Sequence, residues 1–179
     1  MLQKSSIMKT AEIFFSEPTR AHYLIEASEK SGLAHTSTKK NLQQLKRLSI
    51  IKEFLEKRGK RNFPMFKANI ESREYKKYKR INNILQVEES GLADFLKEKL
   101  MPKSIVLFGS YSKGDDIEDS DIDIFVECKK EYIDTNKFEK ILNRKIELHF
   151  NEDFKKYPKE LKNNILNGLI LRGYLEACK

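Results

Sequence analysis

The first third of the chain alternates apolar and polar positions at helical spacing. This periodicity predicts three amphipathic helices, over residues 5–15, 18–30 and about 36–48. Gly32 is typical of a helix stop, and Thr36 is a suitable N-cap for the third helix. The inward faces of the second and third helices are predicted to hold Tyr23, Leu24, Ala27, Leu42, Leu45 and Leu48.

The pattern then changes to short segments rich in β-formers. Residues 50–56 and 62–68 flank a basic bend that contains Gly59, which predicts a β-hairpin. Helical spacing returns over residues 71–86, which predicts a connecting helix, and over 92–100, a helix closed by Pro102.

The second half of the chain predicts strands as well as helices. Residues 104–108 form a continuous apolar run, as in a strand buried on both faces. Residues 120–126 and 145–150 alternate instead, which predicts strands with one polar face. A last helix is predicted from Pro158, with its buried stripe formed by Leu161, Ile165, Leu169 and Ile170. The expected fold class is therefore α+β.

Carboxylates occupy the polar faces of these two alternating strands. Asp121 and Asp123 point away from the apolar side of their strand, and Glu147 lies on the polar face of the other. If the strands are neighbours, the three groups form a cluster, and like charges so close repel each other unless cations bind between them. Oxygen ligands favour magnesium or manganese.

Charge divides the chain in two. Residues 1–87 hold 19 Lys+Arg and 8 Asp+Glu, or +11, and the remainder holds 16 and 19, or −3, which together give the net charge of +8. The basic half suggests contact with a polyanion, although a highly charged, solvated surface of the kind found in heat-adapted proteins is the alternative. On the third predicted helix, the exposed face carries Lys39, Lys40, Gln43, Gln44, Lys46 and Arg47, which can bond phosphates and base edges.

Three helices followed by a basic hairpin resemble the winged helix-turn-helix family over residues 5–70. The resemblance implies that Lys39, Lys40, Gln43 and Gln44 enter the major groove of DNA. It also implies that a wing with Arg58, Lys60 and Arg61 lies on the flanking phosphate backbone. A winged helix that serves only protein contacts or dimerisation is the alternative.

A motif in the second half is more specific. Gly109 and Ser110 are followed, after ten residues, by Asp121-Ile122-Asp123, which resembles the DNA polymerase β-like nucleotidyltransferases, in particular their minimal branch, over residues 90–175. Gly114, Ser120 and the Leu-Phe pair before Gly109 also fit that branch. The resulting domains are a winged helix at 1–70, a helical linker at 71–89 and a nucleotidyltransferase domain at 90–179.

This second resemblance implies a site and a reaction. Gly109, Ser110 and Ser120 would bind the nucleoside triphosphate, and Asp121, Asp123 and Glu147 would hold Mg²⁺ or Mn²⁺ and act in catalysis. A nucleoside monophosphate, AMP if the substrate is ATP, would pass to a protein or nucleic acid with release of pyrophosphate. Glu147 stands where the family more commonly has Asp, and its side chain is one carbon longer.

The resemblance also implies partners. The minimal branch suggests an antitoxin-type enzyme that adenylylates a helical toxin-like protein. The winged helix would bind DNA, and assembly into a homodimer is left open. The alternative function is a transcriptional regulator whose nucleotidyltransferase domain only senses a nucleotide or is inactive.

Other residues carry weaker signals. The acidic loop of Asp115, Asp116, Glu118 and Asp119 is expected to be solvated, with further metal ligands as the alternative. His149 shares the strand face of Glu147 and is expected to be an ordinary half-exposed histidine, with a base or ligand role as the alternative. Cys128 and Cys178 are too few for a disulfide framework, and no leader or long apolar run is found, so a cytoplasmic protein without membrane contact is expected.

Overall fold

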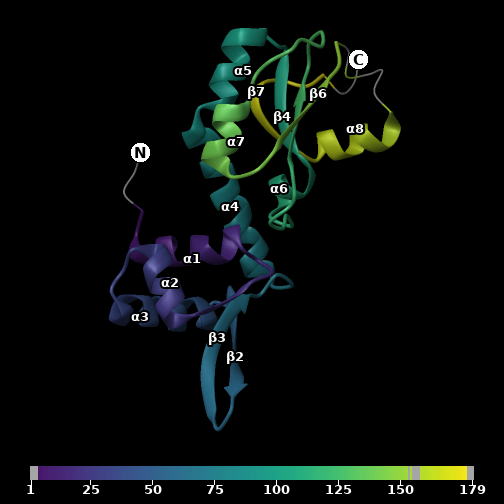
Figure 1. Cartoon of the computed structure of the whole chain (residues 1–179). Coiled ribbons are helices and arrows are strands. Elements are labelled where there is room, and N and C mark those ends of the chain that lie inside the picture. The colour runs from purple at the N-terminus through teal and green to yellow at the C-terminus, as the bar shows by residue number, and fades with distance from the viewer. Residues whose placement is uncertain (1–3, 153, 155–157, 177–179) are drawn as a thin grey trace. The chain divides into compact units, whose positions relative to one another are not determined.

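The chain folds into two compact units, residues 1–82 and 83–179, and the division falls inside one helix. The computed structural model describes residues 4–152, 154 and 158–176. Its fold is α+β: helices with a three-stranded antiparallel sheet come first, and a mixed four-stranded sheet with helices follows (Figure 1). The expected fold class is confirmed.

The N-terminal unit has the order helix, strand, helix, helix and hairpin, which is consistent with a winged helix-turn-helix. Its strands are antiparallel in the order β1-β3-β2. The elements are α1 (Ser6–Ser16), β1 (Ala21–Tyr23), α2 (Leu24–Ser31), α3 (His35–Arg47), β2 (Ile51–Arg58), β3 (Arg61–Ala68) and the first part of α4 (Arg73–Ser90). The hairpin predicted at residues 50–68 is thus present.

The second helix differs from its prediction. Residues 21–23 are a strand that pairs with β3, and α2 begins only at Leu24. The strand turns His22 into the core, where its ring lies edge-on to Phe14 with 5.6 Å between centroids. Burial lowers the pKa of His22, although Glu26 and Glu17 oppose this shift. Tertiary pairing has therefore overridden the local helical spacing.

The third helix has shifted ends. It begins at His35 with Ala34 as N-cap, so the expected cap at Thr36 is wrong. Leu42 and Leu45 are buried as expected, but Leu48 lies beyond the helix end and is 41% exposed. The core of the unit gathers residues from α1, α2, α3, the hairpin and α4, among them Phe14, Ala27, Leu45, Phe66 and Tyr75.

The C-terminal unit is built on a sheet in the order β6-β5-β4-β7. The β5–β6 pair is parallel and the other pairs are antiparallel, so the sheet is mixed. Its elements, after the end of α4, are α5 (Leu92–Leu100), β4 (Ser104–Phe108), α6 (Gly109–Lys113), β5 (Ile122–Val126), α7 (Asn136–Leu142), β6 (Ile146–Phe150), α8 (Lys159–Leu166) and β7 (Leu169–Gly173). The sequence pattern did not predict α7.

The predicted last helix is also corrected. It ends at Leu166, and Leu169 and Ile170 belong to β7, which pairs with β4. Gly168 separates the two elements, and a Cβ there would lie 2.6 Å from the backbone oxygen of Leu107. This close approach lets the chain turn back onto the sheet as a strand.

Helices cover both faces of this sheet. On one face Leu107, Ile124 and Val126 pack with residues of α4, α5 and α7. On the other, Val106, Phe108 and Phe125 pack with Ile165 of α8 (Figure 1). Every residue of β4 is buried, as its apolar run predicts. Asp123 belongs to the α8 face, since it alternates with Ile122 and Ile124 along β5.

None of the helices in the described ranges is both long enough and apolar enough to cross a membrane. Cys128 is a free, half-buried thiol, and Cys178 lies outside the described residues.

Candidate active site

The parallel pairing of β5 and β6 brings carboxylates from two chain segments together. Asp123 lies opposite Glu147 in the register, and His149 follows two residues later on the same face of β6. These three side chains each offer a ligand atom, and the three atoms lie within 4.8 Å of one another. The polar faces of two neighbouring strands thus form an acidic group with one imidazole.

His149 is the centre of this group. Its Nε2 lies 3.2 Å from Asp123 Oδ1 and 3.9 Å from Glu147 Oε1, while its ring packs against Phe108 at 5.1 Å between centroids. The hydrogen bond to Asp123 raises the pKa of His149, burial opposes the shift, and the charge of Glu147 adds to it. The sequence placed His149 on the face of Glu147 but did not predict its contact with Asp123. The two-residue spacing from Glu147 was the signal available.

Gly109 lies directly against the Asp123 carboxylate. Its φ is +74°, and a Cβ on it would be 2.1 Å from Asp123 Oδ2. The contact follows from the pairing of β4 with β5, in which Phe108 is the partner of Asp123. Glycine is therefore required here both by backbone conformation and by space.

Asp121 occupies a different position. It is exposed, precedes β5, and does not join the group of three within the described residues. It borders an open cleft of about 650 Å³ between the acidic loop and α7, whose lining includes Ser120, Asn136, Lys140 and Lys145. The expected cluster of Asp121, Asp123 and Glu147 is thus brought together only in its last two members.

The two serines of the motif differ in their surroundings. Ser110 lies half-buried in α6, directly after Gly109. Ser120 closes a turn of the acidic loop, because its Oγ accepts a hydrogen bond from the amide of Ile117 at 2.9 Å. Lys113, the last residue of α6, is exposed.

One residue of the acidic loop is not solvated. Asp116 is only 3% exposed, and its Oδ1 accepts a hydrogen bond of 2.7 Å from Asn83 Nδ2. The Arg144 guanidinium lies 4.0 Å from its other oxygen. Burial also raises the pKa of neighbouring Tyr111, whose backbone oxygen accepts from Asn83 as well. The prediction of a solvated loop is wrong for Asp116, because residues distant in the sequence bury its carboxylate. Asp115 and Asp119 are exposed, as predicted.

The residues predicted to contact DNA are all exposed. Along α3, Lys39 and Gln43 line a cleft beside Pro64 and Phe66 of the hairpin. Gln44 instead borders an apolar pocket with residues of α1, and Lys40 is simply exposed. On the hairpin are Arg58, Lys60 and Arg61.

Comparison with known proteins gives a match to the family described as "Nucleotidyltransferase domain" over residues 89–172. A relative named "Putative protein adenylyltransferase", from Methanocaldococcus jannaschii, is 46% identical over 61 residues. That match covers 30% of this chain and 61% of the relative, so the chain spans somewhat less than two thirds of the relative's length.

A solved structure titled "Possible transcriptional regulator", from Methanosarcina mazei, matches with 18% identity and a TM-score of 0.38. The match covers 54% of this chain and 79% of that one.

Residues 89–172, which contain the motif and the group of Asp123, Glu147 and His149, form a nucleotidyltransferase domain of the DNA polymerase β-like family.

Proposed function

We propose that the C-terminal unit is a magnesium-dependent nucleotidyltransferase that transfers AMP from ATP to an acceptor. The observation that carries the proposal is the group of Asp123, Glu147 and His149 beside Gly109. Two carboxylates from neighbouring strands converge within 4.8 Å, and Gly109 lies directly against one of them, so together they offer an acidic site.

The donor set fits a divalent cation. Carboxylate oxygens are the ligands that Mg²⁺ and Mn²⁺ prefer, and an imidazole is acceptable to Mn²⁺. Bound here, the cation would neutralise the triphosphate and lower the pKa of an attacking hydroxyl. Asp123 and Glu147 are the residues that would hold it.

The other residues of the motif act around these ligands. His149 holds the Asp123 carboxylate in place through their hydrogen bond. Gly109 lets the Asp123 carboxylate lie directly against the backbone, and Ser110, the next residue, would offer its hydroxyl to the phosphates. Asp121, two residues before Asp123, borders the cleft beside α7 and would supply a further carboxylate to the loaded site.

The reaction is an in-line displacement at the α-phosphorus. An acceptor hydroxyl gives its proton to water and forms a new P–O bond to the α-phosphorus. The bond between the α-phosphorus and the oxygen that bridges it to the β-phosphate breaks, and pyrophosphate leaves. Positioning and charge neutralisation supply the rate, because the protein forms no covalent bond to the nucleotide.

We infer that the acceptor is a protein. The relative from Methanocaldococcus jannaschii is named "Putative protein adenylyltransferase" and is 46% identical over 61 residues. In an antitoxin-type role, the acceptor would be a helical toxin-like protein encoded nearby. A DNA-binding unit in the same chain would suit this role.

Labelled ATP tests the transferase proposal. With Mg²⁺ and cell extract, or with the product of a neighbouring gene, ATP labelled at the α-phosphate should mark an acceptor, whereas ATP labelled at the γ-phosphate should not. The variant with both Asp121→Ala and Asp123→Ala should give no label. Transfer of the γ-label, or equal labelling by the double variant, contradicts the proposal.

We also propose that the N-terminal unit binds duplex DNA through α3 and the hairpin. The exposed Lys39 and Gln43 line one cleft, and Lys60 and Arg61 extend the positive charge to the hairpin end. Such contacts combine base-edge readout by the helix with phosphate contacts by the wing.

The salt dependence of binding tests this second proposal. Affinity for duplex DNA from the region upstream of the gene should fall steeply with salt, and Lys60→Ala with Arg61→Ala should reduce the slope by roughly 0.9 per residue removed. Fluorescence anisotropy at several salt concentrations measures the slope. An unchanged slope would favour a winged helix that contacts proteins instead.

A second candidate function has its own support. Asp121 stands outside the group of three, and the Glu147 side chain is 58% exposed, so the acidic group holds one carboxylate fewer than the motif implies and is open to solvent. A regulator whose second unit binds a nucleotide without turnover would fit that arrangement. It predicts tight binding to the upstream duplex, a nucleotide-dependent change in that binding, and no label on any acceptor.

A further inference from the structure

The outer face of the three-stranded sheet carries aromatic side chains between basic ones. Ile51, Phe66 and Ala68 point the other way and belong to the core of the N-terminal unit. Because side chains alternate along a strand, the residues between them lie on the outer face. This face of β1, β2 and β3 is an aromatic strip, defined by Tyr23, Phe54, Phe63 and Met65.

The strand register places these four side chains in adjacent rows. Tyr23 pairs with Met65, and Met65 pairs with Phe54, so one row crosses all three strands. Phe63 lies in the next row, opposite Glu56. Phe54 is 44% exposed and Phe63 is 36% exposed, so both rings offer surface to a ligand.

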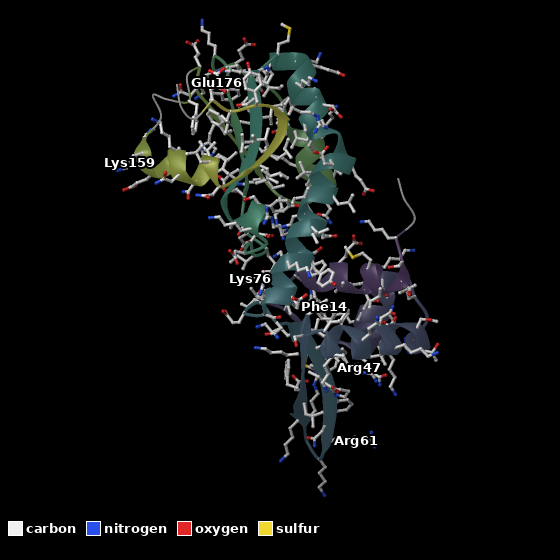
Figure 2. The ribbon with its side chains drawn as sticks, turned by 180° about the vertical axis from the view of Figure 1, so that it is seen from behind. Phe14, Arg47, Arg61, Lys76, Lys159 and Glu176 are labelled. Atoms are coloured by element: carbon white, nitrogen blue, oxygen red, sulfur yellow. The ribbon has the colours of Figure 1, made fainter. Side chains whose placement is uncertain are left out.

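Cations bracket the strip at both ends. Lys52 pairs with Lys67 in the row on one side, and Arg58 pairs with Arg61 in the row on the other. Figure 2 shows Arg61 near the end of the hairpin that is farther from the helices of this unit.

The single carboxylate on this part of the face is already engaged. Glu56 accepts a hydrogen bond from Arg58 at 2.6 Å and another from the Tyr23 hydroxyl. The Arg58 guanidinium also lies over the Tyr23 ring, 5.0 Å from its centroid. The strip therefore lies in a field set by the cations at its two ends.

We propose that the aromatic strip binds single-stranded nucleic acid. Exposed rings on a sheet face stack on unpaired bases, and flanking lysines and arginines contact the phosphates. A duplex would not fit this chemistry, because its base faces are already stacked on one another. The strip is also separate from α3, whose Lys39 and Gln43 lie beside the oppositely directed Phe66.

Binding of a labelled oligothymidylate or oligouridylate of about 15 nucleotides to the full chain tests the proposal. Phe54→Ala with Phe63→Ala should weaken binding at least about tenfold, since each stacked base contributes through an aromatic ring. Phe54→Tyr with Phe63→Tyr should retain it. The matched control is Leu55→Ala, which removes a 62% exposed apolar side chain from the opposite alternation of the same strand and should change binding little.

The same variants separate this surface from the duplex site. The alanine pair should leave binding to duplex DNA unchanged, and Lys52→Gln with Lys67→Gln should lower the single-strand salt slope by about 0.7 per lysine. Circular dichroism and thermal melting confirm that each variant is folded. The proposal would be overturned if the wild-type chain did not bind the single strand, or if Leu55→Ala lost as much affinity as the alanine pair. It would also be overturned if sedimentation experiments showed that the strip forms a dimer contact instead.

Discussion

Asp123→Asn is expected to lower AMP transfer by about 10³-fold or more. The substitution keeps the shape of the side chain but removes the negative charge that the proposed cation needs. It also removes the acceptor charge that holds His149 at 3.2 Å. Initial rates of label incorporation measure the effect, and titration with Mn²⁺ measures metal binding independently of activity.

The matched control for this change is Asp119→Asn. Asp119 is an exposed member of the acidic loop outside the group of three, so the same loss of charge should alter the rate only slightly. Glu147→Gln should weaken Mn²⁺ binding as Asp123→Asn does. Near wild-type turnover in Asp123→Asn, or unaltered Mn²⁺ binding, would show that this carboxylate is not a ligand.

Gly109→Ala should also abolish most activity, with a loss of about 10²-fold or more. The new methyl group would meet Asp123 Oδ2 at 2.1 Å, so the carboxylate must move, and small displacements of a reacting group have effects of this size. Because Asp123 would also move relative to His149, Mn²⁺ affinity should fall with the rate.

Gly91→Ala is a close control for the backbone effect of this substitution. Gly91 has φ +76°, almost that of Gly109, but a Cβ there meets nothing within 4 Å. Both variants should lose stability from the left-handed conformation, by about 1–3 kcal/mol, and only Gly109→Ala should lose activity. If the two variants were equally active, Gly109 would not be needed in the active site. Thermal melting and label incorporation, measured side by side, distinguish these outcomes.

The fold was predictable where one periodicity ruled a whole segment. The segment with a continuous apolar run, residues 104–108, is a strand. The two segments with alternating apolar and polar residues, 122–126 and 146–150, are strands as well. Short elements whose state depends on distant partners were not predictable. Residues 21–23 and 169–173 continue a helical pattern locally, but pairing with β3 and β4 makes them strands.

The site was predictable as a set of residue types more than as a geometry. Alternation placed Asp123 and Glu147 on polar strand faces, and the parallel register makes them partners. The same argument could not show that β5 begins only at Ile122, which leaves Asp121 exposed before the strand. Nor could it place Asn83 and Arg144 around Asp116, since only the tertiary fold brings the three segments together.

The burial of Asp116 affects how genetic screens of this protein should be interpreted. Random mutagenesis scored by loss of labelling would recover substitutions at Asp116 together with those at Asp123, and a map of inactive alleles would place both in one functional patch. The Asp116 carboxylate is nevertheless enclosed between Asn83 and Arg144, so its replacement removes an acceptor of the buried Asn83 amide and the negative charge that faces Arg144. A loss of labelling caused by a substitution at Asp116 would reflect a lower yield of folded protein. The amount of each variant protein in cells would therefore have to be measured before its effect was assigned to catalysis.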